Sequence, residues 1–311
     1  GWFKQRFAEM LAEVVAQQPG VLLLIDYPGF NLRFAKAVRE KCPQTRIVYY
    51  VSPQVWAWNK GRLPKMARLL DQMICLFPFE VPLYDQVGLA CRFVGHPLVD
   101  ELEEKRVPGV VRDERLVALM PGSREREVAR LLPLLIGSAR DLREWRGELR
   151  FEVPAASEKL AAQIRSMIAA AGAAEWIEVR TGSSHSLMQR ACCGVIASGT
   201  ATLEAAYYGL PYGLVYRVAP LTYLMAKLLV KIEFIGIVNI LAGREVIREF
   251  IQGEAVPANV VGMLKPLIES PAAREALQRE LAATTAKLGE PGAHARVAAV
   301  VAEWFGKEAR A

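Results

Sequence analysis

Nine residues, Leu116–Arg124 (LVALMPGSR), indicate the fold class of this chain. Five consecutive apolar residues are typical of a buried parallel strand, and the Pro-Gly-Ser sequence that follows is typical of a turn. A helical pattern begins at Arg124. A strand, a tight turn and a helix form the repeating unit of doubly wound α/β sheets. The segment therefore predicts an α/β fold.

Short apolar runs alternate with amphipathic helical stretches on both sides of this segment, as in βαβ units. The charged stretch 101–115 has little periodicity and is interpreted as a linker. From Val256 onward the pattern is helical only. We expect two Rossmann-like domains, 1–105 and 106–311, with a helical tail on the second. The predicted strands are 21–25, 46–51, 73–77, 92–94, 116–120, 151–153, 177–179, 194–197 and 213–216.

The first domain is expected to be incomplete. It offers only four strands, and nothing before Val21 resembles the opening strand and Gly-rich turn of a doubly wound sheet.

Length and composition agree with two globular domains. The chain has 311 residues, 52% of them apolar and 23% charged, which excludes disordered, collagen-like and coiled-coil classes. The net charge of +6 suits anionic lipid, nucleotide phosphate or nucleic acid. Nucleic acid is the weakest of these partners, because basic and acidic residues are interleaved and no recognition motif is present. Five cysteines without a CxxC pair and three scattered histidines predict reduced thiols and no metal site.

Two strand–turn–helix segments are candidates for binding a diphosphate. In Ala197–Glu204, the residues Ser198, Gly199 and Thr200 form the turn, and helix-start amides with the helix dipole favour an anion. Glu204, one turn later, is placed to accept hydrogen bonds from ribose hydroxyls. The alternative is an ordinary helix that Thr200 caps.

Ser123 and Arg124 repeat this geometry at the first turn of the same domain. The helix dipole disfavours a cation at a helix start, so Arg124 is interpreted as a ligand of an anion. The alternative is a surface arginine that forms an ion pair with Glu125 or Glu127.

Asp26 follows the five apolar residues of the first predicted strand. Open α/β sheets bind ligands outside the carboxyl ends of their strands, where a carboxylate can act as a general base on a hydroxyl. The alternative is a structural aspartate that binds the amides of the turn.

Several stretches suit an anionic membrane surface. The apolar helix Leu221–Val230 has Lys227 and Lys231 on one face, and Arg62, Lys65 and Arg68 form a basic stripe on another helix. Core helices with snorkelling lysines would show the same pattern. A pair of tryptophans, Trp56 and Trp58, is interpreted as an apolar wall for a sugar or acyl chain, or as an interdomain plug.

Seven segments together resemble the lipid-A-disaccharide synthase family of GT-B fold glycosyltransferases. They occur in the family's order along nearly the whole chain: Ile25–Asn31 (IDYPGFN), Tyr50–Trp58 (YVSPQVWAW), Phe77–Glu80 (FPFE), Cys91–His96 (CRFVGH), Pro121–Arg124 (PGSR), Ala197–Glu204 (ASGTATLE) and Asn239–Glu245 (NILAGRE).

The resemblance implies an inverting transfer of 2,3-diacylglucosamine from UDP to the 6-hydroxyl of 2,3-diacylglucosamine 1-phosphate, which gives a β-1,6 disaccharide. It implies Asp26 as the general base and places Arg124 and Asn239 among the residues needed for activity, on the donor side. Glu204 would bind the ribose, and Ser198–Thr200 would face the phosphates. With no DxD-like acidic pair in a suitable loop, no metal or other cofactor is expected.

The lipid substrates imply a cytoplasmic enzyme attached peripherally to the phospholipid surface of the inner membrane. The helical tail is compatible with exchange between subunits of a homodimer. Two alternatives stay open: another GT-B enzyme that uses a UDP-sugar, and a non-catalytic UDP-binding protein at the membrane surface.

Overall fold

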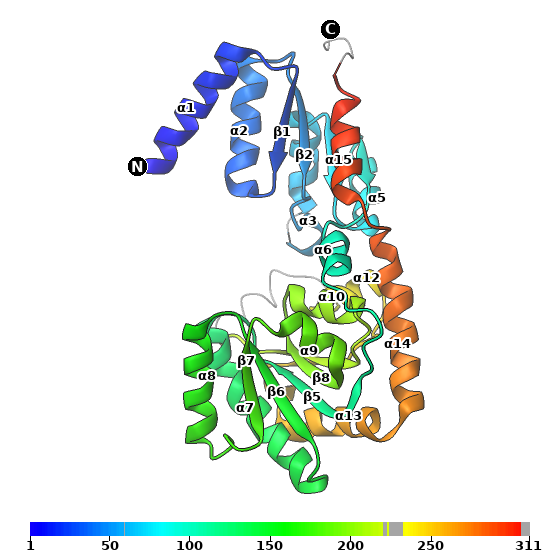
Figure 1. The fold of residues 1–311 in the computed structure, drawn as a ribbon. Helices are drawn as coiled ribbons and strands as arrows, with labels where there is room; N and C mark the ends of the chain where they lie inside the picture. The colour runs from blue at the N-terminus through cyan, green and yellow to red at the C-terminus, as the bar shows by residue number, and fades with distance from the viewer. Residues whose placement is uncertain (59, 220–222, 224–232, 306–311) are drawn as a thin grey trace. The chain divides into compact units, whose positions relative to one another are not determined.

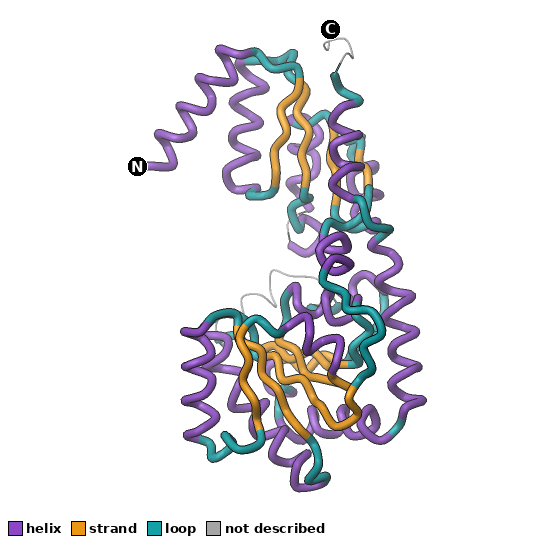
Figure 2. Tube along the Cα trace, viewed as in Figure 1, coloured by secondary structure: helices purple, strands orange, loops and turns teal. Residues whose placement is uncertain are grey.

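The computed structural model describes residues 1–58, 60–219, 223 and 233–305, and these form two compact units (Figure 1). The first unit comprises the described residues of 1–100 and of 287–305. The second comprises the described residues between 101 and 286. Both units are α/β, as predicted, with strands flanked by helices (Figure 2).

The first unit contains a parallel four-stranded sheet of order β1-β2-β3-β4. Its strands are β1 (Val21–Ile25), β2 (Arg46–Tyr50), β3 (Gln72–Cys75) and β4 (Cys91–Phe93). Its helices are α1 (Trp2–Gln17), α2 (Pro28–Lys41), α3 (Val55–Trp58), α4 (Leu63–Leu69), α5 (Val81–Asp85) and α15 (Ala293–Ala302), with 3-10 turns at Lys60–Arg62 and Pro78–Glu80. Because β1 and β2 are parallel, Asp26 and Ser52 follow strands that end at the same edge of the sheet.

Apolar side chains cover both faces of this sheet, as a parallel sheet requires. On one face, Phe34 and Val38 of α2 pack with Ile47 and Met73. On the other, Val297 and Val300 of α15 pack on Val48, Tyr50 and Ile74. In Figure 1, α15 (red) lies beside the sheet of this unit.

The position of α15 corrects the predicted domain boundaries. The sequence reading assigned all of 106–311 to the second domain, whereas the segment from Lys287 packs with the first. The apolar positions of α15 cover a face of β2 and β3 that would otherwise be exposed, and this long-range contact leaves no local signal. The predicted linker 101–115 is also partly ordered, because α6 spans Leu98–Glu104 and β5 begins at Asp113.

The second unit has a parallel six-stranded sheet of order β10-β9-β8-β5-β6-β7. Its strands are β5 (Asp113–Met120), β6 (Arg150–Ala155), β7 (Ile177–Thr181), β8 (Ala191–Ala197), β9 (Tyr212–Tyr216) and β10 (Glu249–Ile251). Its helices are α7 (Glu125–Trp145), α8 (Glu158–Ala170), α9 (Ser184–Arg190), α10 (Thr200–Tyr207), α12 (Ile237–Ala242), α13 (Pro257–Glu269) and α14 (Pro271–Thr285). The short strand β10 is the one described strand that the sequence did not predict.

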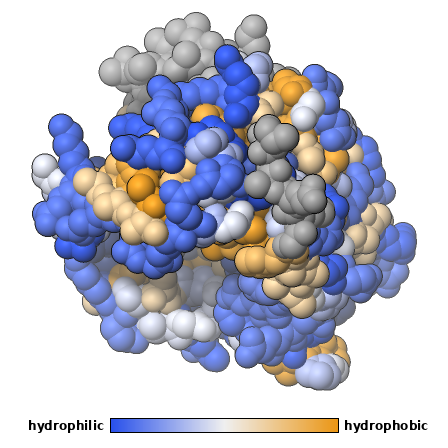
Figure 3. All heavy atoms as spheres, turned by 90° about the horizontal axis from the view of Figure 1, so that it is seen from above, coloured by the Kyte–Doolittle hydropathy of each residue, from blue (hydrophilic) through white to orange (hydrophobic). Residues whose placement is uncertain are grey.

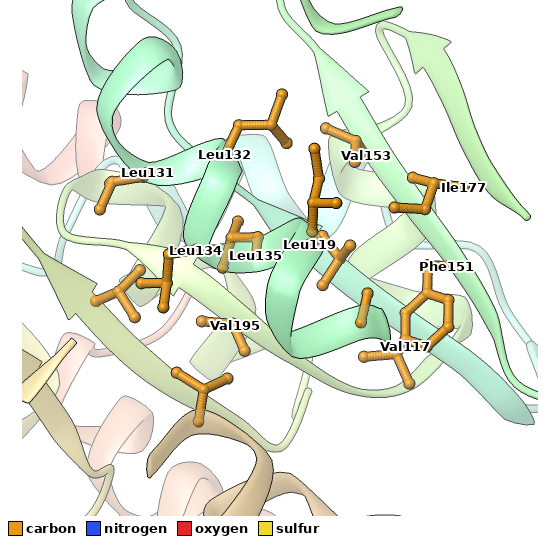
Figure 4. Packing of buried hydrophobic residues seen from close by; sticks show 14 of the residues in the cluster. Val117, Leu119, Leu131, Leu132, Leu134, Leu135, Phe151, Val153, Ile177 and Val195 are labelled. Atoms are coloured by element: carbon orange, nitrogen blue, oxygen red, sulfur yellow. The ribbon is translucent and has the colours of Figure 1, made fainter. Parts of the chain in front are cut away.

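Leucines of α7 fill the core between this helix and the sheet (Figure 4). Leu131, Leu132 and Leu135 recur at helical spacing and pack with Val117 and Leu119 of β5. This packing fixes the start of α7 close to the end of β5, where the predicted phosphate-binding turn lies.

Candidate active site

A cavity of about 600 Å³ opens at the carboxyl ends of the central strands of the second unit. It lies where β5 has β8 on one side and β6 on the other, the point at which the strand order reverses. Open α/β sheets bind ligands at this position. All six predicted UDP-binding residues line the cavity: Ser123, Arg124, Ser198, Gly199, Thr200 and Glu204.

Two helices begin at the rim of this cavity. Arg124 is the N-cap of α7 and Gly199 the N-cap of α10, and neither residue caps its helix through a side chain that accepts from the first amides. Thr200 therefore does not cap α10, which was the alternative to a ligand site. Gly199 has open space where a side chain would stand, so a ligand can reach the backbone there. Uncapped helix starts offer amide donors and partial positive charge to an anion.

Arg124 is the most exposed of the charged groups in this cavity, with 81% of its side chain accessible. Its guanidinium forms an ion pair of 2.8 Å with Glu127, one turn into α7. The predicted ion-pair alternative is thus observed, but an exposed pair of this kind is weak and can open for a stronger anion. Gly122 has a φ of 107° and no room for a side chain beside Glu127, so the turn requires glycine here.

Glu204 is half-buried on α10. Burial and the nearby carboxylate of Glu101 raise the pKa of Glu204, and Lys105 opposes this shift. A partly desolvated carboxylate on a cavity wall is a suitable acceptor for hydroxyl groups.

A second cavity, of about 400 Å³, lies in the first unit and includes Asp26. It is lined by Asp26, Pro28, Val51, Ser52, Pro53, Gln54, Val55, Trp56, Arg62, Leu76, Phe77 and Glu80. These residues come from the segment after β1, the segment after β2 and the turn after β3. The Asp26 side chain is exposed to this space.

Backbone strain is concentrated at this cavity. Asp26, Tyr27 and Val51 have φ values of 48°, 43° and 71°, in the left-handed region that non-glycine residues avoid. Asn31 supports the first pair, since its side-chain amide donates to the carbonyl oxygens of Ile25 and Asp26 at 3.0 and 2.8 Å. Such outliers persist where the surroundings hold them, and they cluster at functional sites.

Glu80 is a buried carboxylate on the wall of the same cavity, only 2% exposed. Its Oε2 accepts hydrogen bonds from the amides of Leu76 and Phe77 at 3.1 and 3.0 Å. Burial raises the pKa of Glu80 to about 7, although Ser52 and the two amides lower it. No role was predicted for Glu80 from the sequence, but a single acid inside an apolar stretch such as 73–84 is a signal for a buried carboxylate.

Asn239 is not among the described residues that line either cavity, and its catalytic role stays a prediction. Its side chain is completely buried at α12. The amide nitrogen donates to the carbonyl of Ile247 and to Glu249, both at 2.8 Å, and the oxygen accepts from the amides of Val246 and Ile247. Four hydrogen bonds use the whole capacity of this amide. These bonds tie α12 to the loop that leads into β10.

Among the described residues, no group of three or more His, Cys, Asp or Glu side chains is placed to hold a metal ion. None of the described helices is long and apolar enough to cross a bilayer. The apolar stretch Leu221–Val230 with Lys227 and Lys231, which we interpreted as membrane-facing, lies outside the described residues except for Tyr223.

Sequence comparison decides the family. Residues 2–301 match the family described as Lipid-A-disaccharide synthetase. A lipid-A-disaccharide synthase of Geobacter sulfurreducens is 38% identical, over 99% of this chain and 81% of the relative. The corresponding protein of Geobacter metallireducens is 39% identical with the same coverage. The chain belongs to the lipid-A-disaccharide synthase family.

Solved structures show the same fold at low sequence identity. A putative UDP-N-acetylglucosamine 2-epimerase from Listeria monocytogenes has a TM-score of 0.66 and 13% identity, over 99% of this chain and 80% of that one. The Neisseria meningitidis UDP-GlcNAc 2-epimerase, solved with UDP-GlcNAc, has a TM-score of 0.61 and 11% identity, over 97% and 81%. Both support the predicted GT-B architecture. Family membership favours lipid-A-disaccharide synthase over the other UDP-sugar enzymes that we had kept as alternatives.

Proposed function

We propose that this chain transfers 2,3-diacylglucosamine from UDP to the 6-hydroxyl of 2,3-diacylglucosamine 1-phosphate, with release of UDP. As a member of the lipid-A-disaccharide synthase family, the chain is a glycosyltransferase. The observation that supports our site assignment most strongly is the convergence of all six predicted UDP-binding residues on one cavity.

The second unit would bind the donor. The starts of α7 and α10 offer amides to the diphosphate, and Arg124 adds a full positive charge that the departing UDP needs. When the bond between the anomeric carbon and the diphosphate oxygen breaks, its electron pair stays on that oxygen, where these groups stabilise the charge. Glu204 would accept hydrogen bonds from the ribose hydroxyls.

The first unit would bind the acceptor. The carboxylate of Asp26 faces its cavity and would take the proton of the 6-hydroxyl as the oxygen bonds to the anomeric carbon of the donor. Attack opposite the leaving UDP inverts the configuration, which matches the β-1,6 linkage that the family resemblance implies. The left-handed backbone at Asp26 and Tyr27 would position this carboxylate for the task.

The first unit also carries features that favour peripheral attachment to the inner membrane from the cytoplasm. Trp2, Phe3 and Tyr27 are large apolar residues more than half exposed, with Lys4 and Arg33 beside them. Aromatic and basic side chains together suit an anionic lipid surface. The face seen in Figure 3 carries hydrophobic patches set among hydrophilic side chains.

The test is disaccharide formation by the full-length protein in neutral detergent, with UDP-diacylglucosamine, diacylglucosamine 1-phosphate and EDTA. We expect product and free UDP in equal amounts. UDP binding without product would favour the non-catalytic alternative. Co-sedimentation with vesicles that contain anionic lipid tests the membrane proposal, and equal binding by a Trp2→Ser, Phe3→Ser variant would contradict it.

A further inference from the structure

A small cationic groove in the first unit adjoins the Asp26 cavity. It has a volume of about 170 Å³ and lies between α2 and the turn and helix that form 60–69. Pro28 and Arg62 line both the groove and the Asp26 cavity, so the two spaces adjoin. The groove is lined by Pro28, Gly29, Leu32, Arg33, Arg62, Lys65, Met66 and Leu69.

The charge of this groove is one-sided. Arg33, Arg62 and Lys65 contribute three cations from two elements, and none of the described lining residues is acidic. Arg33 and Lys65 are exposed and form no hydrogen bond or ion pair with the described part of the chain. Neighbouring cations off the groove behave differently: Lys36 pairs with Glu40, and Arg68 donates to the carbonyl of Pro64.

The backbone adds to this charge. α2 has 14 residues, begins at Pro28 and has no side-chain cap, and its first residues Pro28 and Gly29 line the groove. A side chain at Gly29 would meet nothing within 4 Å, so a ligand can approach the helix start closely. The positive end of the helix therefore faces the same space as the three cations.

We propose that this groove binds the phosphate monoester on the anomeric carbon of the acceptor, through Arg62, Arg33 and Lys65. The inference rests on the proposed function, in which Asp26 receives the 6-hydroxyl of that sugar. A sugar phosphate needs a base for its hydroxyl and cations for its phosphate within one molecule's length, and the two adjoining spaces supply both. Arginine suits a phosphate because its donors can bind two oxygens at once.

An apolar cavity next to the groove favours an amphiphilic ligand rather than a free phosphate ion. A cavity of about 490 Å³ shares Gly29 and Arg33 with the groove and has Phe3, Phe7, Tyr27 and Phe30 on its walls. Apolar walls beside a cationic groove match a phosphorylated sugar that carries acyl chains. Free phosphate would use only the groove.

A comparison of two acceptors, one with and one without the phosphate, tests whether these cations bind the phosphate itself. Transfer by the full-length protein is measured in neutral detergent with diacylglucosamine 1-phosphate and with diacylglucosamine that lacks the phosphate. We expect wild type to prefer the phosphorylated acceptor by about 10- to 100-fold in kcat/KM, the range for hydrogen bonds to a charged group. The triple variant Arg33→Ala, Arg62→Ala, Lys65→Ala should lose most of this preference.

The KM for the UDP-sugar should stay unchanged in this variant, and Arg62→Lys should recover part of the preference. Lys36→Ala and Arg68→Ala are matched controls on the same two helices and should behave as wild type. Titration of a short-chain diacylglucosamine 1-phosphate without donor should show weaker binding only for the groove variants. Thermal unfolding midpoints verify that each variant is folded.

A triple variant that keeps the preference for the phosphorylated acceptor would overturn the proposal. Loss of binding to vesicles that contain anionic lipid, with that preference intact, would assign the cations to a phospholipid headgroup instead. Absence of transfer by wild type with both acceptors would refute the proposed function. In that case the titration still tests whether the groove binds the phosphate. Equal binding of the phosphorylated and the dephosphorylated sugar would overturn the proposed phosphate site.

Discussion

The phenol oxygen of Tyr49 lies 2.5 Å from the main-chain carbonyl oxygen of Asp26. Tyr49 is completely buried, and burial and the charge of Asp26 raise the pKa of its hydroxyl well above the usual value, so the group remains a donor. The side-chain amide of Asn31 donates to the same carbonyl at 2.8 Å. Two donors from different elements therefore hold Asp26 at its φ of 48° and present its carboxylate to the cavity.

Replacement of Asp26 by asparagine should lower kcat by about 10²- to 10⁴-fold, because the amide cannot accept the proton of the 6-hydroxyl. UDP affinity should stay nearly intact, since Asp26 and the proposed UDP-binding residues belong to different units. Steady-state kinetics and calorimetric titration of UDP measure the two effects. Asp85→Asn, an exposed acid on α5, is the control. Ordinary turnover by Asp26→Asn would remove this residue from the base role.

Tyr49→Phe should lower the free energy of unfolding by about 1 kcal/mol, the net value of one hydrogen bond. Asn31 still binds the carbonyl of Asp26, so kcat should fall by a smaller factor than in Asp26→Asn. Urea unfolding and kinetics on the same preparation check both. A kcat equal to that of wild type would show that Tyr49 contributes to stability alone.

Arg124→Ala should weaken UDP affinity by roughly tenfold and lower kcat as well, because the charge acts on the diphosphate in the bound and transition states. The substitution should barely change stability, since the ion pair with Glu127 is exposed. Titration of UDP into each variant is the measurement. Arg126→Ala, an exposed arginine of α7 that does not line the cavity, serves as the control. Unchanged affinity would identify Arg124 as a structural arginine.

Asn239→Ala should lower the free energy of unfolding by about 2–4 kcal/mol, because four hydrogen bonds to Val246, Ile247 and Glu249 are lost, three of them buried. Asn239→Asp should be as harmful, since a second carboxylate would face Glu249 and the carbonyl of Ile247. Denaturant unfolding measures the change, with exposed Asn259→Ala as the matched control. A fully stable but inactive Asn239→Asp variant would support the predicted catalytic role.

Glu80 should make the first unit less stable as pH rises from about 4.5 to about 7. Its folded pKa is raised to about 7, so the folded state binds more protons than the unfolded state in this window. The stabilisation that protonated Glu80 contributes is fully present below the pKa of the unfolded state. It is lost as pH rises through the pKa of the folded state. Glu80→Gln keeps an oxygen for the amides of Leu76 and Phe77 but cannot ionise.

As pH rises from 4.5 to 7, the free energy of unfolding of wild type should therefore fall relative to that of Glu80→Gln. Each unit of pKa shift corresponds to about 1.4 kcal/mol. Unfolding curves at a series of pH values give this difference directly. Glu9→Gln, which replaces an exposed acid on α1, is the control for the loss of one carboxylate. A pH-independent difference for Glu80→Gln would contradict a raised pKa.

Local pattern was sufficient for much of this molecule. Apolar runs such as Val21–Ile25 and Leu116–Met120 are long enough to be strands and too uniformly apolar to be exposed, so they predict a parallel sheet. The turns after two such strands predicted residues that line the cavity of the second unit, because the carboxyl ends of parallel strands meet at one edge. The order of seven short segments also indicated the family before any comparison.

Other features depend on contacts between residues far apart in sequence, which no local pattern encodes. Asn239 is a polar residue like many on a surface, and only packing shows that its side-chain amide is buried and saturated with hydrogen bonds. The stripe of Arg62 and Lys65 suits a membrane or a ligand equally well until Arg33 of α2 is found across a shared groove. In the same way, α15 joins the first unit because a bare sheet face there needs an apolar cover. Sequence thus determined the elements and the family, and tertiary structure decided which side chains are buried, because burial and charge pairing are set by the neighbours that folding brings together.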